Sequence, residues 1–159
     1  MVIINWSVWG DDIISRELLR FEERNLNIMP VGLAIIKDIK DSNQKQFETE
    51  GEHASGGWAP LADSTIAAKV AGGFPLDILQ RTRRLMLSLT EGTEDTIEEV
   101  DPGGFVFGSE VEYGKFHQTG TKTMPQRRPL EFNEVDKVLW MKRIQRYILT
   151  GEVMAADLV

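Results

Sequence analysis

Apolar residues recur every three or four positions near the start of the chain, which is the spacing of one face of an α-helix. The residues in this pattern are Ile14, Leu18, Phe21 and, slightly out of step, Leu26. Asp11 or Asp12 is suited to cap this helix, and Pro30 suits the first turn of a second helix over 31–48. Two helices joined by a short break are typical of an αα-hairpin, which we expect over residues 1–50.

The expected hairpin is charged outside its apolar positions, with eight acidic and six basic residues between positions 11 and 48. Its second helix carries apolar residues on or near one stripe at Leu33, Ile36, Ile39 and Phe47. Such a helix pair packs its apolar side on the rest of the domain or on a neighbouring molecule. We predict that the buried stripe consists of Ile14, Leu18, Phe21, Ile36 and Ile39.

A segment rich in glycine, small residues and proline follows, EGEHASGGWAPLADST at 50–65, and it predicts a loop. A short helix capped by Asp63 or Ser64 is expected to run to about Ala71, where GGFP ends it. The apolar residues between 76 and 90 indicate another helix.

Two short segments rich in β-branched and aromatic residues, 96–100 and 105–111, flank the turn sequence DPGG and predict a β-hairpin. A last helix is expected over 135–149, because Thr150-Gly151 stops it. The fold class is therefore α+β, with helices packed on a small antiparallel β-sheet. We expect a single domain over 1–150 and a flexible tail over 151–159.

Composition limits the number of domains and the classes of protein to which the chain can belong. A chain of 159 residues with 42% hydrophobic content fits one globular domain. It has no apolar run of about 20 residues, as a membrane span would need, and its start, MVIINWSVWGDD, lacks the features of a signal peptide. The absence of cysteine excludes disulfides, thiol catalysis and cysteine-ligated metals, and suits a reducing compartment. A net charge of −7 argues against a dedicated nucleic-acid-binding protein.

The charges are arranged in blocks. Residues 91–112 carry eight acids and no base, whereas residues 113–147 carry eight bases and three acids. Such runs can be two solvated faces. They can also be opposite patches through which copies of the chain bind head to tail, an arrangement that closes into a ring when the rotation permits.

Candidate catalytic chemistry is sparse, and we expect neither an enzyme nor a cofactor or metal site. The chain has two histidines and lacks the HExxH, GxSxG, phosphate-loop and dinucleotide-binding motifs. The acids of 91–112 lack the regular spacing of a calcium-binding loop. We expect His117 to donate to a backbone carbonyl and His53 to be exposed.

Three segments in order carry a family resemblance: GGWAPLADSTIAAK at 56–69, ILQRTRRLMLSL at 78–89 and VFGSEVEYGKFHQTGTKTMPQRRPLEF at 106–132. They resemble the virion-morphogenesis, or tail-completion, family of tailed bacteriophages. That family shows W-x-P-L-x-x-x-T before a lysine, I-L-x-x-T-G-x-L-x-x-S, and G-x-x-x-x-Y-A-x-x-H-Q-x-G leading to R-P-F-L. The resemblance covers about residues 57–132, and Arg83, Gly114 and Leu130 depart from the family pattern.

The resemblance implies a structural virion protein at the head–tail joint or tail end, either a tail completion or terminator protein or a neck protein. Such a protein assembles as a ring, here a hexamer or a dodecamer, and allows tail completion and head–tail joining. Its partners would be copies of itself and other neck or tail proteins, with at most weak contact with DNA in the lumen and none with a membrane. It would be located in the virion, and in the host cytoplasm during assembly.

The segment YGKFHQTGTKTMPQRRPLEF is interpreted as a rigid clasp. One helical turn would put Tyr113, Phe116 and His117 on one face, and Gly120 can end it with a positive φ. The alternative is a loop folded back inside the domain. Trp58 is either a core residue, which we favour, or an anchor for a neighbour, with 47–57 as an interface loop. The candidate interface or structural residues are Trp58, Tyr113, Phe116, His117, Gln118, Arg127 and Arg128.

In this interpretation His117 and Gln118 lock the clasp through backbone groups, while the neighbouring prolines stiffen it, so that Arg127 and Arg128 are presented to a partner. Two other functions stay open. One is a small hydrolase built on His117 with a carboxylate such as Glu112. The other is a nucleic-acid-binding adaptor using Arg81, Arg83, Arg84, Arg127 and Arg128.

Overall fold

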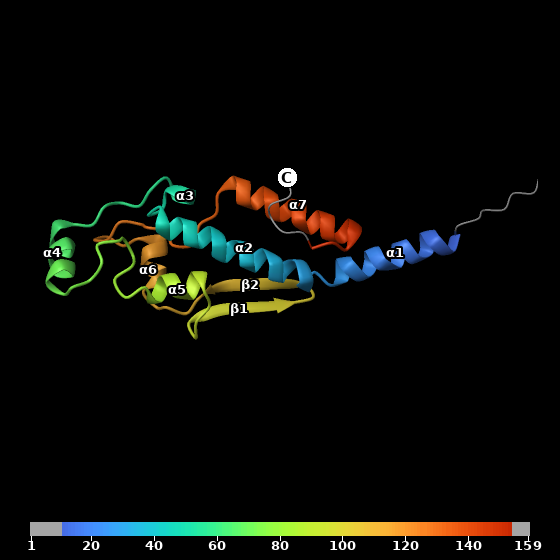
Figure 1. Ribbon diagram of the computed structural model, residues 1–159, viewed down its shortest axis with the longest axis horizontal. Helices are drawn as coiled ribbons and strands as arrows, with labels where there is room; N and C mark the ends of the chain where they lie inside the picture. The colour runs from blue at the N-terminus through green and yellow to red at the C-terminus, as the bar shows by residue number, and fades with distance from the viewer. Residues whose placement is uncertain (1–10, 154–159) are drawn as a thin grey trace, which may run out of the picture.

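The computed structural model describes residues 11–153 of the chain. In chain order its elements are α1 (Asp11–Leu26), α2 (Met29–Glu48), α3 (Glu52–Ser55), α4 (Asp63–Ala71), α5 (Arg84–Thr90), β1 (Thr96–Asp101), β2 (Gly104–Ser109), α6 (Gly114–Thr119) and α7 (Glu134–Thr150). Figure 1 shows an elongated molecule in which α2 lies between α7 and the two-stranded sheet. The α+β class with a pair of helices at its start is confirmed.

Helix α2 is the central helix of the fold, because its buried apolar residues contribute to both core clusters. Toward its start, Val31, Ile35 and Ile39 form one core cluster with Tyr147 of α7. At its end, Phe47 belongs to a second cluster that includes Trp58 and the apolar side of α5. The predicted burial of Ile36 and Ile39 is therefore correct, whereas Leu33 points to solvent.

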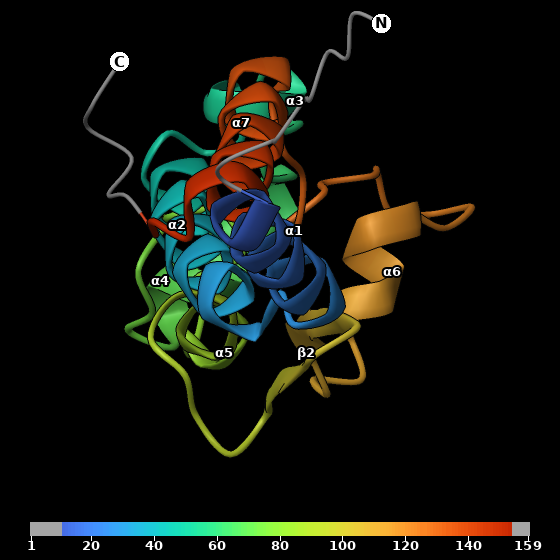
Figure 2. The ribbon, with the colours of Figure 1, turned by 90° about the vertical axis from the view of Figure 1, so that its right-hand side faces the viewer.

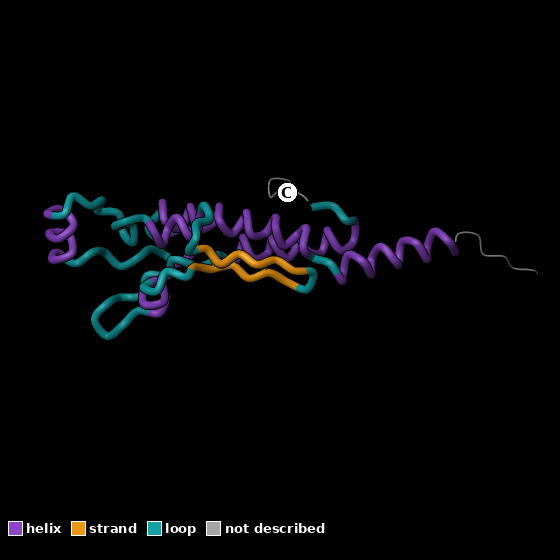
Figure 3. Tube along the Cα trace, turned by 90° about the horizontal axis from the view of Figure 1, so that it is seen from below, coloured by secondary structure: helices purple, strands orange, loops and turns teal. Residues whose placement is uncertain are grey.

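The sheet is the predicted hairpin, and it runs alongside α2 (Figure 3). Its strands pair antiparallel with Thr96 opposite Ser109 and Asp101 opposite Gly104. Gly32 lets the helix approach closely, because a Cβ atom there would lie 3.3 Å from side-chain atoms of Phe105 and Val100. A Cβ atom at this position would require the Phe105 and Val100 side chains to shift by a few tenths of an ångström.

Helix α7 covers the other side of α2, as Figure 2 also shows. Asn133 caps it by accepting a hydrogen bond from the Asp136 amide at 2.8 Å. The Tyr147 hydroxyl donates to the Asn27 carbonyl at 2.9 Å, which ties the end of α7 to the joint between α1 and α2. Gly151 ends α7, and Glu152 accepts a hydrogen bond from Arg146. The rest of the expected tail, 154–159, lies outside the described residues.

Two of the predicted boundaries are wrong. The helix expected over 76–90 is restricted to α5, because Leu79 and Arg83 adopt positive φ angles of 62° and 59° that interrupt a helix. The segment 50–65, predicted as a loop, contains the short helix α3. Among the described helices, none is long and apolar enough to cross a membrane.

Candidate functional site

Helix α1 projects from the body of the molecule (Figure 1). From Asp12 to Leu26 its side chains are exposed, apart from the partly buried Arg24 at the base, which lies beside Gly151. Six large apolar side chains are 42–66% exposed: Ile13, Ile14, Leu18, Leu19, Phe21 and Leu26. The prediction that Ile14, Leu18 and Phe21 are buried in one stripe with α2 is wrong for this subunit, because all three side chains are exposed.

The predicted clasp is a folded segment whose two arginines differ. Arg127 is not presented outward: it is 7% exposed, and its Nε and Nη2 donate to the carbonyls of Ala59 and Pro60 at 2.7 and 2.8 Å. Burial lowers the pKa of the Arg127 guanidinium. Arg128 is exposed, and its Nη1 donates to both carboxylate oxygens of Glu131 at 2.9 Å.

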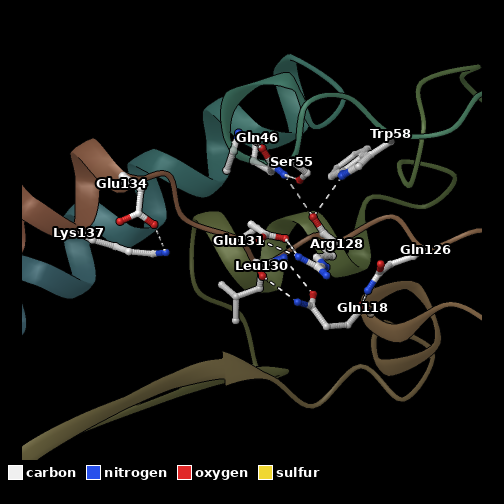
Figure 4. Close-up of polar contacts among 11 residues, drawn as sticks. Gln46, Ser55, Trp58, Gln118, Gln126, Arg128, Leu130, Glu131, Glu134 and Lys137 are labelled. Atoms are coloured by element: carbon white, nitrogen blue, oxygen red, sulfur yellow. Dashed lines mark hydrogen bonds and ion pairs between the residues drawn. The ribbon is translucent and has the colours of Figure 1, made fainter.

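Backbone groups of the clasp are held by side chains from two directions (Figure 4). The Arg128 carbonyl accepts from Trp58 Nε1 at 3.1 Å and from Gln46 Nε2 at 3.3 Å. Gln118 Nε2 donates to the Leu130 carbonyl at 2.8 Å, and its Oε1 accepts from the Leu130 amide at 3.3 Å. Trp58 is thus a core residue, packed edge-to-face on Phe47. Gln118 fixes the clasp through backbone groups, as predicted from its amide side chain.

Helix α6 brings Tyr113 and His117 together, with ring centroids 6.1 Å apart in an edge-to-face arrangement, while Phe116 is exposed. Gly120 ends the helix with a φ of 72°, as predicted. His117 departs from expectation, because its buried Nδ1 has no hydrogen-bond partner among residues 11–153. Burial, and then the charge of Arg127, lowers the pKa of the imidazole.

We expect this environment to make stability depend on pH. The pKa of His117 is lower in the folded chain than in the unfolded chain, so protonation favours unfolding. The stabilisation holds above the unfolded pKa of about 6.5 and is lost as pH falls below it. Urea denaturation between about pH 7.5 and pH 5 should therefore show wild type losing more stability than His117→Asn, which carries no titrating group. Parallel pH profiles for the two proteins would contradict this.

The imidazole lies in the wall of a cavity with a volume of about 530 Å³ between α4, α6 and the segments around them. Its walls are largely apolar, with Leu61, Phe74, Leu79 and Met124 among the lining residues. Ligand pockets in proteins typically have volumes of about 300–1,000 Å³. The cavity is therefore large enough to accept several side chains of a partner.

Two buried cations also line this cavity, Arg127 and Lys69 of α4. Lys69 is 6% exposed, and its Nζ donates to the Asp77 carbonyl at 2.7 Å. Burial lowers the pKa of Lys69, and the negative charges of Asp77 and Glu50, which raise that pKa, offset the effect only in part. Within the described chain neither cation forms an ion pair with a carboxylate.

His53 is not an exposed loop residue, contrary to expectation. Its Nε2 lies 3.1 Å from Ser42 Oγ, 3.2 Å from Asp136 Oδ2 and 3.2 Å from Asn133 Nδ2. The composition resembles a Ser-His-Asp triad, but a triad places the serine and the carboxylate on different ring nitrogens. Here all three partners meet one nitrogen, and Ser42 donates directly to Asp136 at 2.6 Å. The cluster fastens α2 and the α3 segment to the start of α7.

The two charge blocks are partly neutralised within the chain. In the acidic block, Glu98 pairs with Lys40 at 2.5 Å and Asp95 pairs with Arg84 at 2.5 Å. In the basic block, Arg143 pairs with Asp38 at 2.7 Å. Most of the arginines considered for nucleic-acid contact also have partners within the chain. Arg81 lies over the Phe74 ring, Arg84 pairs with Asp95, and Arg127 and Arg128 make the contacts described above. Over residues 11–153 the structure shows no cluster of three or more metal-ligating side chains.

Comparisons with protein-family models, with curated proteins and with solved structures found no match to this chain.

Sequence reasoning missed Lys69 and the exposure of α1. The lysine was quoted only as part of the resemblance, and nothing in its neighbourhood along the chain signals burial. The signal for α1 was present, because its acids and bases surround an apolar stripe on a helix that precedes the glycine-rich region. That pattern does not say whether the stripe faces its own domain or another molecule.

Proposed function

We propose that this protein is a structural protein that assembles with copies of itself into a ring. The observation that carries the proposal is helix α1, an amphipathic helix that projects from the body of the molecule (Figure 1) with its large apolar side chains exposed. The family resemblance of residues 57–132 suggests where such a ring acts: at the head–tail joint or the tail end of a phage virion, where it allows tail completion and head–tail joining.

The physical reason is the cost of leaving α1 uncovered. An isolated helix shorter than about 12–15 residues is marginal in water, and α1, at 16 residues, is only slightly longer. Fully burying one leucine or phenylalanine side chain contributes about 1.5–3 kcal/mol. Ile14, Leu18 and Phe21, which follow one another at helical spacing and are exposed, therefore provide a driving force for association. Exposed apolar side chains gathered on one face of a helix in this way mark an interaction site.

The test is the oligomeric state of the purified chain. Sedimentation velocity over a range of concentrations is expected to show association, and negative-stain images are expected to show closed rings. A monomer at every concentration would contradict the proposal. Tight binding to duplex DNA near physiological salt would also contradict it, because it would favour the nucleic-acid-binding adaptor.

A further inference from the structure

The molecule has an exposed helix at one end and a largely apolar cavity at the other; these are called the arm (α1) and the pocket (the cavity described above). Helix α1 lies at one end of the long axis, and α4 and α6, which line the cavity described above, lie at the other end (Figure 1). An arm and a pocket on opposite ends cannot meet within one subunit. They can meet between subunits arranged head to tail.

The pocket needs an occupant with two chemical properties. Its apolar walls fit hydrophobic side chains, and Phe74 and Met124 belong to those walls. Lys69 and Arg127 are buried beside the same cavity, and their hydrogen bonds run to backbone carbonyls. Buried charges in proteins are normally paired, because an uncompensated charge costs much of its hydration energy. The charges of Asp77 and Glu50 offset part of the burial of Lys69 without forming an ion pair with it, and a carboxylate from outside the subunit would give Lys69 and Arg127 a direct ion-pair partner.

Helix α1 has both properties on one face. Leu18 and Phe21 are separated by three positions, and Glu22 follows Leu18 by four, so the three side chains are neighbours on the helix surface. All three are exposed. The helix as a whole carries five acids against three bases, which matches a pocket lined by cations.

We infer that α1 of one copy docks into the pocket of the next copy, an inference that rests on the proposed self-assembly. Leu18 and Phe21 enter the apolar cavity, and the Glu22 carboxylate faces Lys69 and Arg127. Because each copy uses a different surface to give and to receive, the contact is heterologous and repeats from subunit to subunit. A suitable rotation per step closes the repeat into a ring.

Two kinds of variant separate this contact from others. The arm variant is Leu18→Asp with Phe21→Asp, and its matched control is Leu19→Asp, which is equally exposed on another side of α1. The pocket variant is Thr65→Glu with Thr82→Glu, which adds carboxylates at two exposed lining positions. Its control is Ser64→Glu, an exposed neighbour on α4 outside the lining. Circular dichroism and thermal melting establish that each variant is folded.

Sedimentation velocity is then applied to each variant and to an equimolar mixture. We expect the arm and pocket variants each to associate about 100-fold more weakly than wild type or more, and both controls to assemble normally. The mixture should form a heterodimer and stop there, because only one intact arm and one intact pocket remain.

Other outcomes overturn the inference while leaving self-assembly intact. If wild type and the pocket variant assemble but the arm variant does not, α1 pairs with α1 or with a different surface. Unchanged assembly of the arm variant would show that α1 is not the contact, and a mixture without heterodimer would exclude complementation. A wild-type chain that stays monomeric would instead overturn the proposed function itself.

Discussion

Replacing Ile36 by Asp is expected to lower the free energy of unfolding by about 4–6 kcal/mol, a large fraction of the about 5–15 kcal/mol that is typical of a domain. Ile36 is 1% exposed in the middle of α2, the helix between the sheet and α7. The substitution removes a packed side chain and buries a carboxylate without a partner. Urea denaturation followed by circular dichroism measures the effect.

The matched control is Leu33→Asp, in the same helix and one turn away. Leu33 is 51% exposed, so its replacement should change the free energy of unfolding by less than about 1 kcal/mol. Equal losses at the two positions would indicate a general effect of aspartate on the helix. An Ile36→Asp variant that melts like wild type would show that this face of α2 is not part of the core of the folded domain.

Replacing Arg127 by Met is expected to lower the free energy of unfolding by about 3 kcal/mol, because the Ala59 and Pro60 carbonyls lose their donors. Methionine keeps much of the apolar stem, so the loss reports mainly on the hydrogen bonds and not on packing. Thermal and urea denaturation of the purified variant measure it. Arg127 thus holds the segment around Ala59 against the clasp, although its position beside a second arginine suggested an outward-facing side chain.

Arg128→Met is the control, with an expected loss below about 1 kcal/mol, because the Arg128 side chain is exposed and, among residues 11–153, pairs only with Glu131. The Arg128 carbonyl, which accepts from Trp58 and Gln46, is unaffected by this substitution. Comparable destabilisation by both variants would contradict the distinction between the two arginines. In a test of assembly, reversal of Arg128 alone therefore reports on subunit contacts, whereas reversal of Arg127 also perturbs the fold.

Local patterns in the sequence were enough to predict several elements. The helical spacing of apolar residues located α2 and α7 to within a few residues, and DPGG between two β-branched and aromatic segments located the hairpin. Gly120 was identified as a positive-φ stop because few other residues adopt that conformation. These features depend on residues that are close together along the chain, and for that reason they are visible in the sequence.

Tertiary structure decided which of these surfaces are buried. Arg127 reaches carbonyls 68 and 67 positions earlier in the chain, and no local pattern records such a contact. Likewise His53 meets Asp136, 83 positions later. The apolar stripe of α1 was correctly located but wrongly assigned to the core, because periodicity shows that a face needs covering and not what covers it. The sequence thus determined the elements and their apolar faces. Only their arrangement in space left α1 exposed at one end and, at the other, two buried cations beside a cavity that form no ion pair within residues 11–153.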